Sequence, residues 1–108
     1  MAGESGAQTP DWDALTQLKG DLLREFQDAG VDHVEYVVGF IAPFDFWVWL
    51  GTATDTERDS LARRSDLSDR VRAAAERRDL ATTFEGVTIE SKETLDREYE
   101  GSWFHRLR

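Results

Sequence analysis

Two histidines, His33 and His105, are the residues of this 108-residue chain best suited to acid–base or metal chemistry. His33 is followed closely by Glu35 and preceded by Asp32, and imidazole beside carboxylates is a donor set that divalent metals accept. Two histidines without a fixed spacing to carboxylates more often lie at the surface or the edge of a core, and we favour that interpretation. The chain has no HExxH motif, EF-hand pattern or glycine-rich phosphate loop. We therefore expect no cofactor, no metal and no catalytic residue, and an enzymatic function is disfavoured.

Asp45 is the carboxylate with the most unusual surroundings, because it stands between Phe44 and Phe46. Burial of an aspartate among aromatic rings shifts its protonation and can give it a functional role. The simpler and favoured alternative is a turn aspartate that accepts hydrogen bonds from backbone N–H groups. The functional alternative is a Trp-lined pocket with Asp45 and His105 as its polar groups, which would bind a small molecule or serve a small enzyme.

The segment 40–50 contains five aromatic residues with a proline near its centre. This pattern predicts a β-hairpin with strands at about 34–41 and 46–53. Pro43 belongs in the turn, because it has no N–H to donate to a strand ladder. Both faces of such a hairpin are apolar, so it needs cover on both sides or leaves one face for a partner.

Trp47 and Trp49 share one face of the second predicted strand, since side chains alternate along a strand. Tyr36 or Val37 would be the cross-strand neighbour of this pair. The two rings either belong to the core, with Trp103 and Phe104 available as cover, or form a flat platform for a ligand or partner. We favour the core interpretation.

Helices are predicted at both ends of the chain and between the second and third strands. Thr9 is the expected N-cap of the first helix, Pro10 its first residue and Gly30 its stop. Its apolar stripe has helical spacing and consists of Leu15, Leu18, Leu22 and Phe26.

The segment 54–79 predicts helical structure that begins with a capping box formed by Thr54 and Glu57. A second helical piece is expected to start at Ser65 or Ser68. The narrow buried stripe of this piece consists of Leu67, Val71, Ala74 and Ala75. A strand over 84–91 and a final helix from about Lys92 complete the pattern.

The predicted fold class is α+β, with element order α-β-β-α-β-α and a small, mainly antiparallel sheet packed with helices. The sheet has three strands, or four if residues 103–107 form a strand instead of continuing the final helix. The third strand would lie beside the second or beside the first, and the latter gives the order 2-1-3. We expect the first and last helices to cover one face, and the Trp47/Trp49 face to be only partly covered. Residues 1–8 are expected to be a disordered tail and 9–108 a single domain.

Acidic residues outnumber basic ones, and the net charge is −9. Residues 1–54 hold nine acids against two bases, a field that repels nucleic acid and anionic membranes and attracts cationic partners. There is no cysteine, no signal peptide and no apolar run long enough to span a bilayer, so we expect a cytoplasmic location without membrane insertion. Arginine is frequent, lysine rare and asparagine absent, which indicates a GC-rich bacterial genome.

The leading functional hypothesis is a non-enzymatic module that binds a protein through acidic residues and hairpin aromatics. The candidate partner-binding residues are Asp21, Glu25, Asp28, Asp32, Glu35, Asp45, Trp47 and Trp49. In size, acidity and its Trp-rich sheet the chain resembles toxin-immunity proteins. A concrete form of the hypothesis, based on the acidic segment beside the aromatic hairpin, is inhibition of a basic enzyme whose active site this chain covers. The alternatives are a small-molecule-binding domain or small enzyme, and a homodimer formed through the Trp face.

Overall fold

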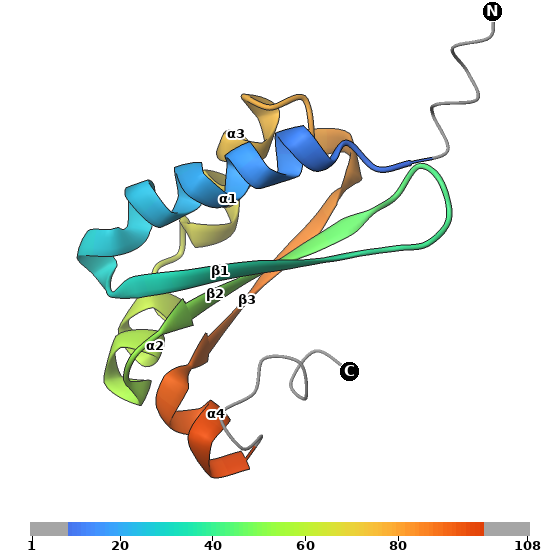
Figure 1. Ribbon diagram of the computed structural model, residues 1–108. Helices are drawn as coiled ribbons and strands as arrows, with labels where there is room; N and C mark the ends of the chain where they lie inside the picture. Colours follow the sequence, from blue (N-terminus) through green and yellow to red (C-terminus); the bar gives the residue numbers. More distant parts are fainter. Residues whose placement is uncertain (1–8, 99–108) are drawn as a thin grey trace, which may run out of the picture.

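The computed structural model describes residues 9–98, which form a small sheet with helices on one face and at one end (Figure 1). The elements in chain order are α1 (Trp12–Phe26), the 3-10 turn η2 (Gln27–Ala29), β1 (Val31–Val38), β2 (Phe46–Thr52), α2 (Asp55–Ala62), α3 (Leu67–Glu76), the 3-10 turn η3 (Ala81–Thr83), β3 (Phe84–Ser91) and α4 (Lys92–Glu98). This order confirms the predicted α+β class. The tail predicted at 1–8 and the two alternatives for 103–107 lie outside the described residues.

The sheet has the strand order β1-β2-β3 and is mixed. β1 and β2 form an antiparallel hairpin, and β3 lies beside β2 in parallel. Of the two placements predicted for the third strand, the structure has the one next to the second strand, and the order 2-1-3 is not formed. The parallel pairing is possible because α2 and α3 carry the chain back along the sheet before β3 begins.

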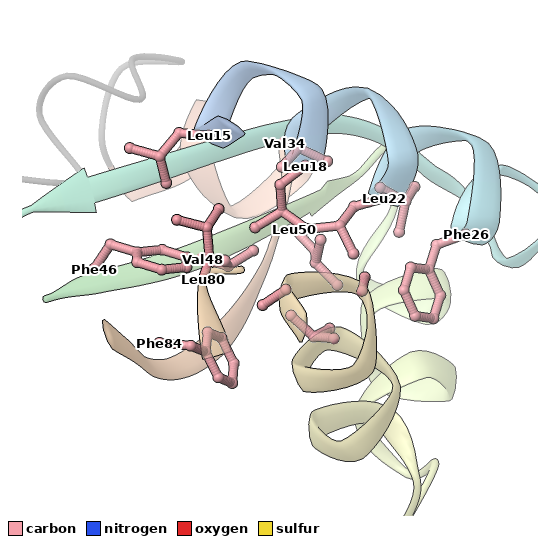
Figure 2. Packing of buried hydrophobic residues seen from close by; sticks show 14 of the residues in the cluster. Leu15, Leu18, Leu22, Phe26, Val34, Phe46, Val48, Leu50, Leu80 and Phe84 are labelled. Carbon is pink, nitrogen blue, oxygen red and sulfur yellow. The ribbon is translucent and has the colours of Figure 1, made fainter. Parts of the chain in front are cut away.

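The hydrophobic core lies on the sheet face that α1 and α3 cover (Figure 2). Alternate residues of β2 point into it, and Val48 and Leu50 are almost completely buried. The whole predicted stripe of α1 is buried there, as Leu15, Leu18, Leu22 and Phe26. The predicted stripe of α3 is also buried, as Leu67, Val71, Ala74 and Ala75. Both helices therefore form because burial of one apolar side stabilises them.

The prediction that the first and last helices share one face is wrong, because α3 and not α4 lies beside α1 (Figure 1). Ala74 and Ala75 are small, so α3 can approach the sheet closely in spite of its narrow stripe. α4 follows β3 without a loop. It therefore stays at the end of the sheet, near α2.

The first strand begins and ends three residues earlier than predicted. Gly30 adopts a left-handed conformation (φ 98°) and turns the chain directly into β1 at Val31. At the other end, the Gly39 N–H donates to the Asp45 carbonyl at 2.8 Å and closes the hairpin. Phe40 and Ile41 consequently lie in the connecting loop and not in the strand.

The helix starts show how local sequence sets the caps. Asp11, and not the predicted Thr9, caps α1, and its carboxylate accepts from the Ala14 N–H at 3.1 Å. The predicted capping box at α2 is confirmed, because Thr54 and Glu57 each form a hydrogen bond with the backbone of the other.

Within residues 9–98, none of the helices combines the length and the apolar character that crossing a bilayer requires.

Candidate functional site

Two of the predicted partner-binding acids hold α1 against α3 and the residues that directly follow it. Asp21 accepts two hydrogen bonds from the Arg78 guanidinium, at 2.7 and 2.9 Å. Glu25 accepts from Arg70 at 3.0 Å and lies 3.6 Å from Arg77. The hydrogen bond from Arg78 lowers the pKa of Asp21 below its ordinary range. These two carboxylates are therefore used for packing within the chain.

The other predicted acids do not form one surface. Asp28 and Asp32 are exposed where α1 leads into β1, at the end of the hairpin opposite its connecting loop. Glu35 lies on the sheet face turned away from the core, and its carboxylate is 3.0 Å from His33 Nε2. Asp45 is exposed in the connecting loop. The acidic part of the prediction thus divides into separate positions around the molecule.

The sheet face opposite the core carries both candidate tryptophans; we call it the Trp face. Trp47 stands opposite Val37 in the hairpin, and Trp49 opposite Glu35. The Trp47 indole lies over Gly86 of β3, where an added Cβ would come within 2.8 Å of the ring. Its Nε1 donates to Thr88 Oγ1 at 2.7 Å.

The Trp47 ring therefore lies along this face, and it stays 39% exposed. The partial cover predicted for the Trp face is confirmed for Trp47. Of the two predicted neighbours, Val37 is the correct one. Tyr36 points to the other face, where its ring lies 6.4 Å from that of Trp12.

The connecting loop, residues 39–45, carries the most exposed apolar side chains among the described residues. Phe40 is 100% exposed and Ile41 is 82% exposed. The backbone is nevertheless defined by a turn over residues 41–44, with a cis Ala42–Pro43 bond and a hydrogen bond from the Phe44 N–H to the Ile41 carbonyl at 2.9 Å. We call Phe40 and Ile41, held on this turn, the hairpin tip.

A groove of about 470 Å³ lies beside the hairpin tip, between the loop, the start of α1 and the link from α3 to β3. Its apolar lining includes Pro10, Leu15, Pro43, Phe44, Phe46 and Leu80. The pocket predicted with Asp45 and His105 is not confirmed, because Asp45 is exposed and His105 lies outside the described residues.

Sequence reasoning misses the hairpin tip as a surface, because the apolar run 34–41 predicts one continuous strand. The available signal was Pro43, whose turn begins at Ile41 and leaves Phe40 outside the sheet.

In residues 9–98, no group of three or more histidine and carboxylate side chains is arranged to hold a metal ion. The chain matches no protein-family model, no curated protein and no solved structure.

A polar cluster at the carboxyl ends of β2 and β3 was also not predicted. Asp55, at the start of α2, accepts hydrogen bonds from the Ser91 hydroxyl, the Thr94 hydroxyl and Arg97. Arg58 reaches the same cluster and binds the Thr94 hydroxyl at 2.8 Å. These contacts join α2, β3 and α4, and we assign the cluster a structural role.

The Asp55 cluster predicts a pH dependence of stability. The hydrogen bond from Ser91, helped by those from Thr94 and Arg97, lowers the pKa of Asp55 from 3.8 to about 2. A lowered folded-state pKa means that the charged form stabilises the fold above pH 4, and that this stabilisation is lost as the pH falls from 3.8 towards 2. In urea titrations between pH 2 and pH 5, the Asp55→Asn variant should show a shallower fall in unfolding free energy than the wild type.

The matched control is Asp69→Asn, which changes an exposed aspartate of α3. Its pH profile should run parallel to that of the wild type. Parallel profiles for all three proteins would mean that the Asp55 carboxylate gains nothing from the cluster.

Proposed function

We propose that this chain is a non-enzymatic module that binds a protein partner through the hairpin tip. The observation that carries the proposal is the full exposure of Phe40 together with the near-full exposure of Ile41. Large apolar side chains at the end of an ordered projection are typical anchors of protein interfaces. Figure 1 shows the connecting loop at the end of the hairpin farthest from α2 and α4, where a partner can approach it.

Backbone hydrogen bonds hold the loop that carries the hairpin tip in one conformation. The Gly39–Asp45 and Phe44–Ile41 hydrogen bonds fix the loop before any partner arrives, so that little conformational entropy is lost on association. Burial of a phenylalanine or isoleucine side chain stabilises a complex by about 1.5–3 kcal/mol each. Two such anchors are enough to dominate a small interface.

The charge of the molecule supports a basic partner. The chain carries a net charge of −9, and Asp45 is exposed in the same loop as the hairpin tip. Negative charge beside an apolar anchor speeds encounter with a positively charged surface and orients it. The partner we propose is a basic protein with an apolar pocket, as an immunity-type inhibitor of a basic enzyme would require. We place this function in the bacterial cytoplasm, in keeping with a chain without cysteine.

The double substitution Phe40→Ser and Ile41→Ser tests the proposal. A partner isolated with the wild-type protein should bind the double variant about 100-fold more weakly, which corresponds to roughly 3 kcal/mol. Dissociation constants from isothermal titration calorimetry measure this difference. The fold should be unaffected, because both side chains are exposed, and circular dichroism checks this.

The matched control is Trp12→Ser, which removes an exposed apolar side chain of α1. The control should bind within a few-fold of the wild type. A partner that binds the tip variant as tightly as the wild type, or that loses affinity only with the control, would contradict the proposed site. Sedimentation equilibrium of the wild type alone separates a hetero-partner from self-association, the homodimer alternative.

A further inference from the structure

The Trp face is the part of the sheet that the described helices leave open. α1 and α3 lie on the other face (Figures 1 and 2). Val37 and Trp47 are about two-fifths exposed, and Trp49 is half-buried. Large apolar side chains gathered on one face of a sheet favour a cover that removes them from water.

The chain leaves the described structure at this side of the sheet. α4 lies at the end of β3, on the side away from α1 and α3 (Figure 1). Leu95 of α4 is fully buried, yet it is not among the described residues of the main core cluster. The buried side of α4 therefore belongs to a different packing unit from the core beneath α1.

The ten residues that follow α4 have the length and composition to complete this second unit. An extended chain of ten residues reaches up to roughly 33 Å, whereas a seven-residue strand such as β2 is about 23 Å long. Three large apolar residues continue from Leu95 at intervals of four, namely Tyr99, Trp103 and Leu107, and Phe104 lies next to Trp103. Arg106 and Arg108 oppose the acidic charge of the rest of the chain.

We propose that residues 99–108 bind back onto the Trp face and cover Val37, Trp47 and Trp49. The Trp face is then a second, internal core, and the hairpin tip remains the surface available to other proteins. This inference does not depend on the proposed function, because the segment and the hairpin tip are different parts of the chain. The occupant of the face is a segment of the same molecule and not a second copy.

Fluorescence quenching in the full chain tests this inference. The substitutions Trp12→Phe and Trp103→Phe leave Trp47 and Trp49 as the only tryptophans. In that background, Tyr99→Ser, Phe104→Ser and Leu107→Ser together should raise the acrylamide quenching constant about twofold, because indole rings released from an apolar cover meet solvent. An unchanged quenching constant would overturn the proposal.

A cross-linking experiment does not depend on the stability of that multiple variant. The chain has no cysteine, so a protein with Val37→Cys and Phe104→Cys contains one possible pair. Oxidation should give a disulfide within a single chain, seen by mass spectrometry under non-reducing conditions. The control pairs Phe104→Cys with Gln27→Cys, which is exposed on the helical side, and should stay reduced. Disulfides only between two chains, or equal oxidation of both pairs, would overturn the inference.

Discussion

Replacement of Phe26 by alanine is expected to lower the free energy of unfolding by about 3–5 kcal/mol. The ring is completely buried at the end of α1 (Figure 2). The guanidinium groups of Arg64 and Arg70 lie 5.9 and 5.0 Å from its centroid. Alanine would leave a cavity where α1 meets α3 and would remove the surface on which both cations rest. Urea denaturation followed by circular dichroism at 25 °C measures the loss.

Two further variants separate the contributions at this position. Phe26→Leu keeps most of the apolar volume and removes the ring, so it should cost about 1–2 kcal/mol. Gln27→Ala changes the next, exposed residue and should stay within about 0.5 kcal/mol of the wild type. If Phe26→Ala were as stable as Gln27→Ala, the packing of α1 described above would be wrong.

Replacement of Ala74 by leucine is expected to cost about 1–3 kcal/mol, because the added atoms have no space in a closely packed core. Ala74 and Ala75 are completely buried where α3 approaches the sheet. The larger side chain must push α3 away from the strands or adopt a strained rotamer. For a domain of this size, the melting temperature should fall by roughly 4–20 °C.

The same substitution one residue earlier provides the control. Ala73 is partly exposed on α3, so Ala73→Leu should change stability by no more than about 0.5 kcal/mol. Leucine and alanine have similar helix propensities, which means that the difference between the two variants reports packing and not helix formation. Equal melting temperatures for both variants would show that α3 does not lie tightly on the sheet.

Local features of the fold could be predicted from the sequence because their causes are local. The stripe of α1 follows from helical spacing, and the capping box at Thr54 from side-chain bonds across three residues. The start of α4 at Lys92 was also predicted correctly. The sequence does not decide the position of β3, because only packing between distant segments determines which strand it joins. The choice of α3 as the partner of α1 depends on how closely its alanines approach the sheet, which periodicity does not report.

The candidate site was predicted less well, for a related reason. The acids of α1 have their partners far along the chain, since Glu25 and Arg70 are 45 residues apart and Asp21 and Arg78 are 57 apart. The net charge of residues 1–54 therefore predicts an acidic surface at Asp21 and Glu25, whereas in the folded chain both carboxylates are paired with arginines. The exposure of Phe40 and Ile41 follows from where the hairpin closes, at Gly39 and Asp45, and apolar character alone predicts burial for both.

The parallel pairing of β3 with β2 has a consequence for the order in which the chain can fold. The hairpin of β1 and β2 brings together residues close in sequence, and α1 can cover it early. β3 runs parallel to β2, with Phe84 beside Phe46, so the chain must return to the start of β2 before the two strands can pair. This return is made by α2 and α3, and β3 can therefore join only after both have been synthesised. During synthesis, the long-range half of the topology is completed last. Until then, the edge of β2 that later binds β3 has unpaired backbone N–H and C=O groups. During this interval the nascent chain is most exposed to strand pairing with another molecule.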